Sequence, residues 1–265
     1  MKKFYYLKIY KELLEKNFKI YLEYKIDFFI GIVSIFFQLI MLFLFFEIYF
    51  YKFKIFPNWK KEEFVFMYSI SVLISGIYNM FFQNLWSLGW FYIREGELDY
   101  LMVRPINVLF QICTKKFLFE NIILIVTGFY FLFYTIMKLN ITLNLLLFFQ
   151  ITVTLVSGII IIFSLNLFFL SMSFWIDDST FIAIGIYNLK DYGRLPLEIF
   201  PKIIQFILTF VLPYSFTSYY PSFNILLKNN KSLNFIISSF LFSIVLFIFS
   251  YKFWLKGLKK YRSTN

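Results

Sequence analysis

The chain has 265 residues, of which 60% are hydrophobic, 25% aromatic and 15% charged, and its formal net charge is +11. Soluble domains contain a little under half apolar residues and need a polar exterior, so this composition excludes an ordinary soluble fold and predicts an integral membrane protein. Most Lys and Arg residues lie near the two ends and between apolar runs, where they would meet anionic lipid headgroups. We therefore interpret the charge as membrane-surface charge in the plasma membrane, and we expect no nucleic-acid partner.

Residue counts exclude several kinds of chemistry. The chain has one cysteine, Cys113, and no histidine, which rules out disulfide frameworks, thiolate zinc sites and histidine-based acid–base catalysis within it. We predict no catalytic, metal-binding or cofactor-binding residue, and we expect Cys113 to be a small packing residue. Lys and Glu are frequent in the first 25 residues, so we expect no cleavable signal peptide and a cytoplasmic N-terminus.

Residues 1–25 are expected to form an amphipathic helix at the cytoplasmic interface, and residues 26–265 a transmembrane domain. Apolar residues recur at helical spacing at Leu7, Tyr10, Leu14, Phe18 and Tyr21. Basic residues occupy other positions, at Lys8, Lys11, Lys16 and Lys19. Such a helix can lie in the headgroup plane with its cationic side chains in water, or pack against a cytosolic partner, and the two arrangements are compatible.

Long apolar runs predict the membrane crossings. The clear runs cover about residues 28–50, 64–88, 117–137, 145–176 and 233–254, and each can cross a hydrocarbon layer of roughly 30 Å. The last run is followed by a tail rich in Lys and Arg, which indicates a cytoplasmic C-terminus. Because both termini are then cytoplasmic, residues 177–232 must supply one more crossing, which gives six.

Two stretches compete for this fifth crossing. Residues 203–220 are apolar, but Pro213 interrupts a run that is already short for a full crossing. Alternatively, the chain crosses at about residues 179–195, and residues 196–224 then form a broken, re-entrant pair of short helices on the outer side. The residues alone leave both assignments open.

Polar residues inside the predicted crossings are costly in lipid and need an explanation. The candidates are Gln38, Asn79, Gln83, Asn84, Gln150 and Asn166, with Glu47 at the end of the first crossing. We favour hydrogen bonding between packed helices as their role, and lining of a substrate pathway is the alternative.

The loop between the second and third crossings, about residues 89–116, is too charged to enter lipid. Its central residues are Arg94, Glu95, Gly96, Glu97, Leu98, Asp99, Arg104 and Pro105. Gly96 allows a break before a short helix, acidic residues favour the N-terminal end of that helix, and Pro105 tends to stop it. This pattern predicts a short amphipathic helix on the cytoplasmic face; the alternative is a solvated connecting loop.

Four segments of the chain, taken together, carry a family resemblance. They are IREGELDYLMVRPINVLFQ in the charged loop, KDYGRLPLEIFP at residues 190–201, LPYSFTSYYP at residues 212–221 and GLKKYRS at residues 257–263. In this order they resemble the permeases of the type 2 exporter group of ABC transporters, and the resemblance spans essentially the whole chain.

The resemblance implies a function for each region. Residues 94–104 would form a coupling helix that docks into a groove of a separate ATP-binding subunit, and residues 4–24 would form the interface helix. It further implies a re-entrant helix pair before the last crossing, which favours residues 179–195 as the fifth crossing although Lys190, Asp191 and Arg194 make it polar. A second permease copy or a sister permease would complete the transporter in a bacterial plasma membrane.

Two other functions are alternatives to this one. The chain contains no GxxxxGK[ST] pattern, so ATP would be bound and hydrolysed on the partner subunit. A membrane-embedded lipid-modifying enzyme could use the adjacent carboxylates Asp177 and Asp178 to hold a divalent metal, but no further spaced carboxylates support them. A secondary transporter would usually show internal repeats of crossings, and none is convincing here.

Overall fold

The computed structural model describes residues 2–52, 59–176, 179–226 and 232–261. Every regular element in those ranges is a helix, and no strand forms among them. The α-helices are α1 (Lys2–Glu23), α2 (Lys25–Lys52), α3 (Lys61–Phe82), α4 (Leu98–Met102), α5 (Val108–Thr114), α6 (Ile122–Lys138), α7 (Leu145–Ser171), α8 (Thr180–Asn188), α9 (Lys202–Phe206), α10 (Tyr219–Leu226) and α11 (Ser232–Lys260). The shorter 3-10 and π-helical turns are η1 (Gln83–Leu88), η2 (Gly89–Arg94), η3 (Phe119–Asn121), η4 (Met172–Phe174), η5 (Leu189–Arg194), η6 (Leu197–Ile199), η7 (Ile207–Val211) and η8 (Tyr214–Phe216).

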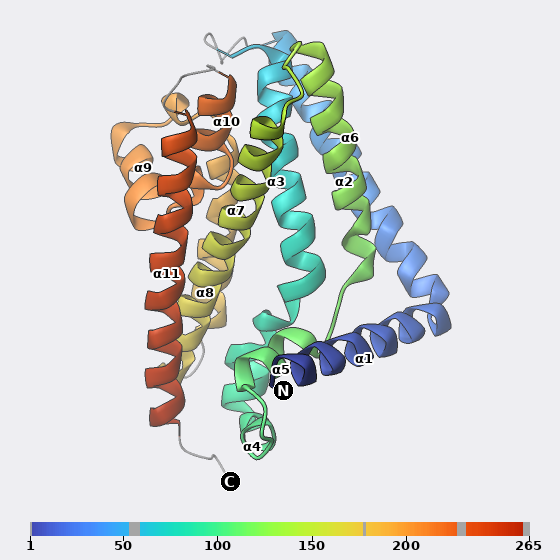
Figure 1. Cartoon of the computed structure of the whole chain (residues 1–265), viewed down its shortest axis with the longest axis vertical. Helices are drawn as coiled ribbons and strands as arrows, with labels where there is room; N and C mark the ends of the chain where they lie inside the picture. Colours follow the sequence, from blue (N-terminus) through green and yellow to red (C-terminus); the bar gives the residue numbers. More distant parts are fainter. Residues whose placement is uncertain (1, 53–58, 177–178, 227–231, 262–265) are drawn as a thin grey trace.

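The long helices run side by side along one axis, and α1 lies across one end of them (Figure 1). That end also holds α4, α5, the start of α1 and the end of α11, and we call it the α4 end. The opposite end, where α3 begins and α10 lies, is the α10 end. The first and last described helices therefore meet at the same end of the molecule.

Four helical stretches of the described residues are long and apolar enough to cross a membrane. They are Lys61–Arg94, Phe119–Lys138, Leu145–Phe174 and Leu233–Lys260. Two bent pairs also qualify when each is taken as one unit, Tyr5–Glu23 with Lys25–Met41 and Lys202–Val211 with Tyr214–Leu226, which brings the count to as many as six. The prediction of an all-helical membrane protein is confirmed, and the exact number of six crossings stays a prediction.

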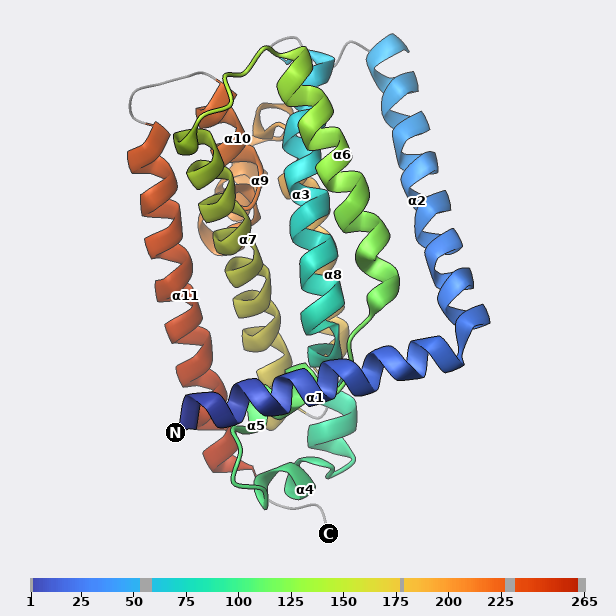
Figure 2. The ribbon, with the colours of Figure 1, turned by 45° about the vertical axis from the view of Figure 1, so that its right-hand side comes forward.

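The bend between α1 and α2 measures 93°, so α1 lies nearly perpendicular to the bundle while α2 runs along it (Figure 2). Helix α1 carries exposed ion pairs on its surface, Lys8–Glu12 (4.0 Å) and Lys11–Glu15 (3.7 Å). Helix α2, by contrast, consists almost entirely of apolar residues. A charged amphipathic helix remains at the headgroup level and an apolar one enters hydrocarbon, which accounts for the bend.

The centre of the bundle is α3, which is buried along most of its length between α6 and α7. Small residues allow the close approach. A Cβ atom on Gly76 would lie 3.1 Å from the backbone nitrogen of Ile125, and one on Gly128 would lie 3.1 Å from that of Leu73. Reciprocal glycines of this kind let membrane helices gain dispersion contacts where the hydrophobic effect supplies no drive for association.

The region between α7 and α11 consists of short helices. α8 has nine residues and η5 has six, and together they occupy the stretch predicted as the fifth crossing. Farther along the chain, α9 and η7 form one helical segment, and η8 and α10 form the next. The two segments meet at an angle of 74°. Figure 1 shows α9 and α10 in the half of the molecule away from α4. Pro213 lies at the bend, so this placement favours a re-entrant pair over a straight crossing.

Candidate functional site

The loop after the second predicted crossing is a helical hairpin. Helix α3 continues through η1 and η2 to Arg94, and the chain then turns at Gly96, whose φ of 81° lies in the left-handed region that favours glycine. Helix α4 begins two residues later and ends at Met102, ahead of Pro105. The break and the stop therefore lie where the glycine and the proline place them.

The inner side of α4 is buried. Leu98 and Leu101 are 0% and 5% exposed and belong to an apolar cluster that includes Trp254 of α11, itself 1% exposed. Gln111 of α5 ties the hairpin together, because its side-chain amide donates to the backbone oxygens of Leu101 and Ile106, at 3.0 Å each. The hairpin is thus fixed to the bundle as a packed unit rather than a solvated loop.

The outer side of α4 is exposed and projects from the α4 end (Figure 2). We call this surface the tip, and it comprises the exposed residues Arg94, Glu95, Glu97, Tyr100, Met102, Val103, Arg104 and Pro105. Val103 is 86% exposed and Tyr100 63%, and the Arg104 guanidinium carbon lies 4.4 Å from the centre of the Tyr100 ring. Apolar side chains ringed by charges of both signs are typical of a protein-binding surface.

Of the hairpin residues chosen from the sequence, Glu97 and Asp99 differ in their surroundings. Glu97 is exposed at the N-cap position of α4 and its side chain makes no cap hydrogen bond. Asp99 is half-buried, and its carboxylate lies near Tyr261 at the end of α11. Burial first, and then the charge of Asp99, raises the pKa of the Tyr261 hydroxyl. Asp99 therefore links α4 to α11, and Glu97 remains available at the surface.

Asn107 joins three helices at the base of the hairpin. Its side-chain oxygen accepts from the Phe110 N–H (3.1 Å) and caps α5, its side-chain amide donates to Tyr251 of α11 (3.2 Å), and its backbone N–H donates to Tyr6 of α1 (3.2 Å). Asn107 was not predicted as a site residue, although an Asn two residues after a proline and directly before an apolar run is a recognisable helix start.

Helix α1 is fastened to the far side of the same hairpin. Asn17 is 7% exposed; its amide donates to the Lys115 oxygen (3.4 Å) and its side-chain oxygen accepts from the Phe117 N–H (3.4 Å). The rings of Tyr10 and Phe117 meet edge to face at 5.6 Å. Of the apolar positions predicted to form one stripe, Leu7 and Phe18 are more than half exposed, which leaves them free to contact headgroups.

The polar residues of the crossings mostly bond to neighbouring helices. The Asn166 amide donates to the Tyr78 hydroxyl (2.6 Å), the Asn84 amide to the Ile112 oxygen (2.6 Å), and the Asn79 oxygen accepts from the Tyr187 hydroxyl (2.9 Å). Gln150 is 3% exposed inside the bundle. Gln38 is exposed on α2 instead, so helix packing does not account for it.

Gln83 faces an open cleft of about 550 Å³ between η1–η2 and α8. Gln83, Trp86 and Trp90 line one wall; Thr180, Ile184 and Tyr187 line the other; Lys116 lies at the margin. None of the described residues that line this cleft is acidic. The cleft therefore offers amide, indole and ammonium donors beside apolar surface, and its wall leads directly into the tip.

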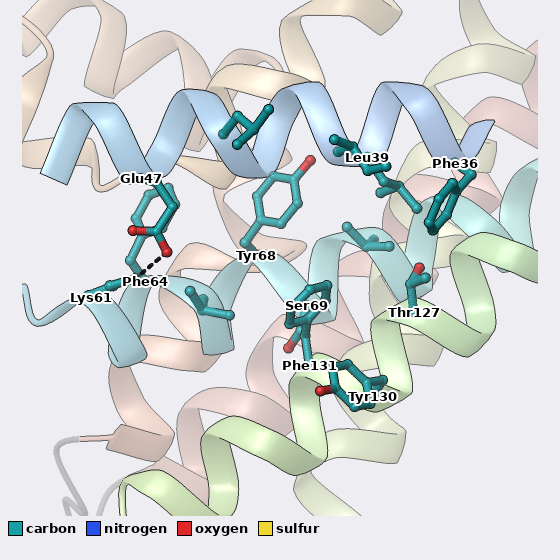
Figure 3. A pocket seen from close by; sticks show the side chains of 14 residues that line it. Phe36, Leu39, Glu47, Lys61, Phe64, Tyr68, Ser69, Thr127, Tyr130 and Phe131 are labelled. Carbon is teal, nitrogen blue, oxygen red and sulfur yellow. Dashed lines mark hydrogen bonds and ion pairs between the residues drawn. The ribbon is translucent and has the colours of Figure 1, made fainter. Parts of the chain in front are cut away.

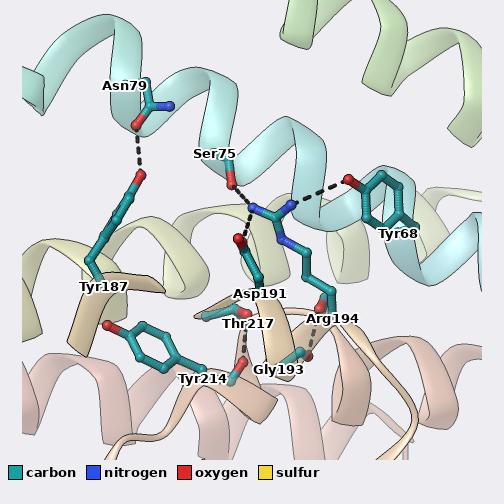
Figure 4. Close-up of polar contacts among 10 residues, drawn as sticks. Tyr68, Ser75, Asn79, Tyr187, Asp191, Gly193, Arg194, Tyr214 and Thr217 are labelled. Atoms are coloured by element: carbon teal, nitrogen blue, oxygen red, sulfur yellow. Dashed lines mark hydrogen bonds and ion pairs between the residues drawn. The ribbon is translucent and has the colours of Figure 1, made fainter. Parts of the chain in front are cut away.

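A buried arginine joins the re-entrant region to α3 (Figure 4). The Arg194 guanidinium pairs with Asp191 (2.8 Å) and donates to the Ser75 and Tyr68 hydroxyls at 3.1 and 3.3 Å. The Arg194 side chain is 13% exposed, whereas that of Asp191 is 59% exposed. Several donors on a planar fork allow one side chain to satisfy three partners, which explains an arginine at this depth.

The remaining candidates for chemistry are few. Burial raises the pKa of the Cys113 thiol to about 12, so it remains a protonated packing group. No cluster of three or more metal-ligating side chains occurs among the described residues. Asp177 and Asp178, the two carboxylates of the alternative metal site, lie outside the described residues.

Comparison with protein families decides the identity of this architecture. The model described as ABC-2 family transporter protein matches residues 36–265, which is most of the chain. The chain belongs to the ABC-2 transporter family. Neither curated proteins nor solved structures return a match.

The family assignment confirms the resemblance found in the sequence and makes this chain an ABC-2 type permease in a membrane. Members of this family are transmembrane components rather than enzymes, which argues against the lipid-modifying alternative. The matched residues include the α4–α5 hairpin, the Arg194 cluster and α11, while the whole of α1 and the beginning of α2 precede the match.

Proposed function

We propose that this ABC-2 permease is the membrane subunit of an ATP-driven exporter and that the tip is the surface on which a separate ATP-binding subunit docks. The observation that carries this proposal is that one side of α4 is buried and the other is exposed. Leu98 and Leu101 fix its inner side to the bundle, and Tyr100, Met102 and Val103 remain exposed on the outer side. A short helix held in this way moves as a body with the helices behind it, as transmission of a partner's motion requires.

The same proposal orients the molecule. The α4 end would face the cytoplasm, because a soluble ATP-binding subunit works there and because α11 ends in Lys259 and Lys260. Both ends of the chain would then be cytoplasmic, and the re-entrant helices would lie in the outer half of the membrane. ATP would be bound on the partner, since the chain has no GxxxxGK[ST] loop.

A second permease, either another copy or a sister chain, would complete the pathway. We place the path of the cargo along the cleft lined by Gln83 and Trp90, because its wall is continuous with the tip. Donor groups without an acidic neighbour favour cargo that carries acceptor oxygens or negative charge. Cargo bound in the cleft would then contact η1 and η2, the part of the helix that ends at the docking surface.

Affinity purification of the tagged chain from its native membranes in mild detergent, followed by mass spectrometry, tests the docking proposal. We expect a stoichiometric ATP-binding protein, with or without a second permease. A chain that elutes without an ATPase in several detergents would contradict the proposal and favour a secondary transporter, whose transport would respond to an ion gradient.

Accessibility tests the cargo path separately. A Gln83→Cys variant in the assembled transporter should react with a membrane-impermeant maleimide, and the rate should change when ATP is added. Leu143→Cys, 62% exposed between α6 and α7, is the control and should react at a rate independent of ATP. An ATP-independent rate at Gln83→Cys would remove the cleft from the pathway without affecting the docking proposal.

A further inference from the structure

An apolar cavity lies between α2, α3 and α6, away from the cleft and the tip (Figure 3). Its volume is about 350 Å³. The lining includes Phe36, Ile40 and Leu44 of α2, Val72 of α3 and Tyr130 of α6. The Phe36, Ile40 and Leu44 side chains are 47%, 36% and 48% exposed. The cavity therefore opens at the surface of the bundle, where an apolar space in a membrane domain can admit hydrocarbon.

The cavity exists because α2 contacts the rest of the bundle at two points and lies farther from α3 and α6 between those points. Near the α4 end, a Cβ atom on Gly31 would lie 3.2 Å from the Cβ of Glu120, so α2 comes close to η3 there. Toward the α10 end, Glu47 of α2 pairs with Lys61 of α3. The two points are separated by about 24 Å along α2, at 1.5 Å per residue. This distance covers most of a hydrocarbon layer of roughly 30 Å.

Three of the hydroxyl groups along the cavity already have partners. Ser69 donates to the Phe66 oxygen (2.6 Å), Thr127 donates to the Ile123 oxygen (2.7 Å), and the Tyr68 hydroxyl accepts from Arg194 (3.3 Å). A polar ligand would lose its hydrogen bonds to water and find few replacements here, whereas a hydrocarbon chain loses nothing. The interior of the cavity therefore selects an aliphatic chain.

One end of the cavity is charged. Figure 3 shows the Glu47–Lys61 pair at one end and Phe36 at the other. The side chains of Lys61 and Glu47 are 44% and 39% exposed, so both can reach a second partner. An ammonium beside a carboxylate complements a headgroup that contains a phosphate and an amine, since each charge of the headgroup meets its opposite.

We propose that this cavity is a binding site for one membrane phospholipid, with an acyl chain between α2 and α3 and a zwitterionic headgroup at Glu47 and Lys61. The lipid would come from the leaflet at the α10 end. It would fill the space that separates α2 from the bundle and hold α2 at its present distance, independently of cargo and of the ATP-binding subunit.

Native mass spectrometry of the full-length complex, released from detergent micelles, tests this site. We expect one phospholipid per chain to resist delipidation. Ile40→Trp with Leu44→Trp places two indoles in the cavity and should remove that lipid. Met41→Trp is the matched control, because Met41 is on the same helix, 65% exposed and outside the cavity; it should retain the lipid. Equal retention in both variants would overturn the proposal.

Photolabelling gives a second readout that does not depend on the variants folding well. Complexes in vesicles that contain a phosphatidylethanolamine with a diazirine on its acyl chain should label peptides around Phe36 and Thr127 more strongly than the peptide around Phe249, which is 57% exposed on α11. Uniform labelling of all lipid-facing helices would overturn the proposal.

Discussion

The side-chain amide of Asn107 lies 3.2 Å from the Tyr251 hydroxyl and donates a hydrogen bond to it. The two residues are 144 positions apart, and the bond joins the base of the α4–α5 hairpin to α11. Because the backbone N–H of Asn107 also binds Tyr6, a displacement of the hairpin acts on the first and last helices together. This contact makes Asn107 a positioning residue for the docking surface.

We expect Asn107→Ala to destabilise the protein by about 1 kcal/mol through loss of the α5 cap, and also to weaken coupling between ATP hydrolysis and transport. Asn144→Ala is the control. Asn144 caps α7 by accepting from the Leu147 N–H at 2.7 Å, at the opposite end of the bundle. Thermal unfolding should show similar losses for the two variants, and only Asn107→Ala should alter transport-linked ATPase activity. Equal coupling defects would contradict this role.

Val103→Asp should weaken binding of the ATP-binding subunit. Placing a carboxylate at the most exposed apolar position of the tip should cost about 2 kcal/mol of binding, or roughly 30-fold in affinity. Leu143→Asp introduces the same charge at an exposed leucine far from the tip and should bind normally. Pull-down of the ATPase with each purified variant measures the difference, and unchanged capture by Val103→Asp would place the docking surface elsewhere.

Gly257→Ala should be poorly tolerated. A Cβ atom there would lie 2.1 Å from Cδ2 of Phe174, whose ring packs on Trp254 at 5.2 Å. Displacing this ring should cost about 1–3 kcal/mol, as overpacked cores do, and Phe174→Leu should restore part of it. Gly185→Ala is the control, because nothing lies within 4 Å of its new Cβ atom. It should be neutral or gain up to about 1 kcal/mol in helix propensity. Thermal stability in detergent distinguishes the two.

The lone cysteine should resist alkylation in the folded protein. Cys113 is buried and its thiol has a pKa of about 12, so at neutral pH it carries no thiolate, the species that reacts. A Val103→Cys variant should react rapidly with a maleimide and be protected by the ATP-binding subunit. Intact mass before and after treatment gives the count, and fast modification of wild-type protein would show that the α5 region opens.

Arg194→Lys should loosen the re-entrant region. A lysine cannot reproduce the donors that reach Ser75 and Tyr68 together, and the loss should cost about 1–3 kcal/mol. Asp191→Asn should have a smaller effect, because Asp191 is 59% exposed and water can replace its partner. Unfolding temperatures that rank the two variants in the opposite order would contradict the assignment of Arg194 as the anchor.

Helix positions were largely predictable, because the length of an apolar run is written in the sequence. The run at 145–176 corresponds to Leu145–Phe174, and the run at 117–137 to Phe119–Lys138. The last helix extends to Lys260, six residues beyond the predicted end, because Trp254 and Gly257 still pack there. Hydropathy detects the edge of the lipid and cannot detect a helix that continues on packing alone.

The contacts that define the candidate site were less predictable. Gly96 and Pro105 predicted a break and a stop by local backbone preference, and the structure has both. The partners of Arg194, by contrast, lie more than 100 positions away at Tyr68 and Ser75. Packing across the whole bundle decides which faces of two helices contact each other. No local pattern in a single sequence shows these contacts. For the same reason, the sequence did not show that Gln38 is exposed on α2 whereas Gln83 lines a cleft.

The continuous helix Lys61–Arg94 has 34 residues, which at 1.5 Å per residue is roughly 50 Å long. A bilayer with its headgroups measures about 40–45 Å, so a helix that starts at one surface emerges from the other by a turn or more before the chain reaches Gly96. The tip therefore lies in water, beyond the part of the helix that the bilayer covers. If the tip is the docking surface, as proposed above, insertion of the permease into the bilayer does not require the soluble subunit to be bound.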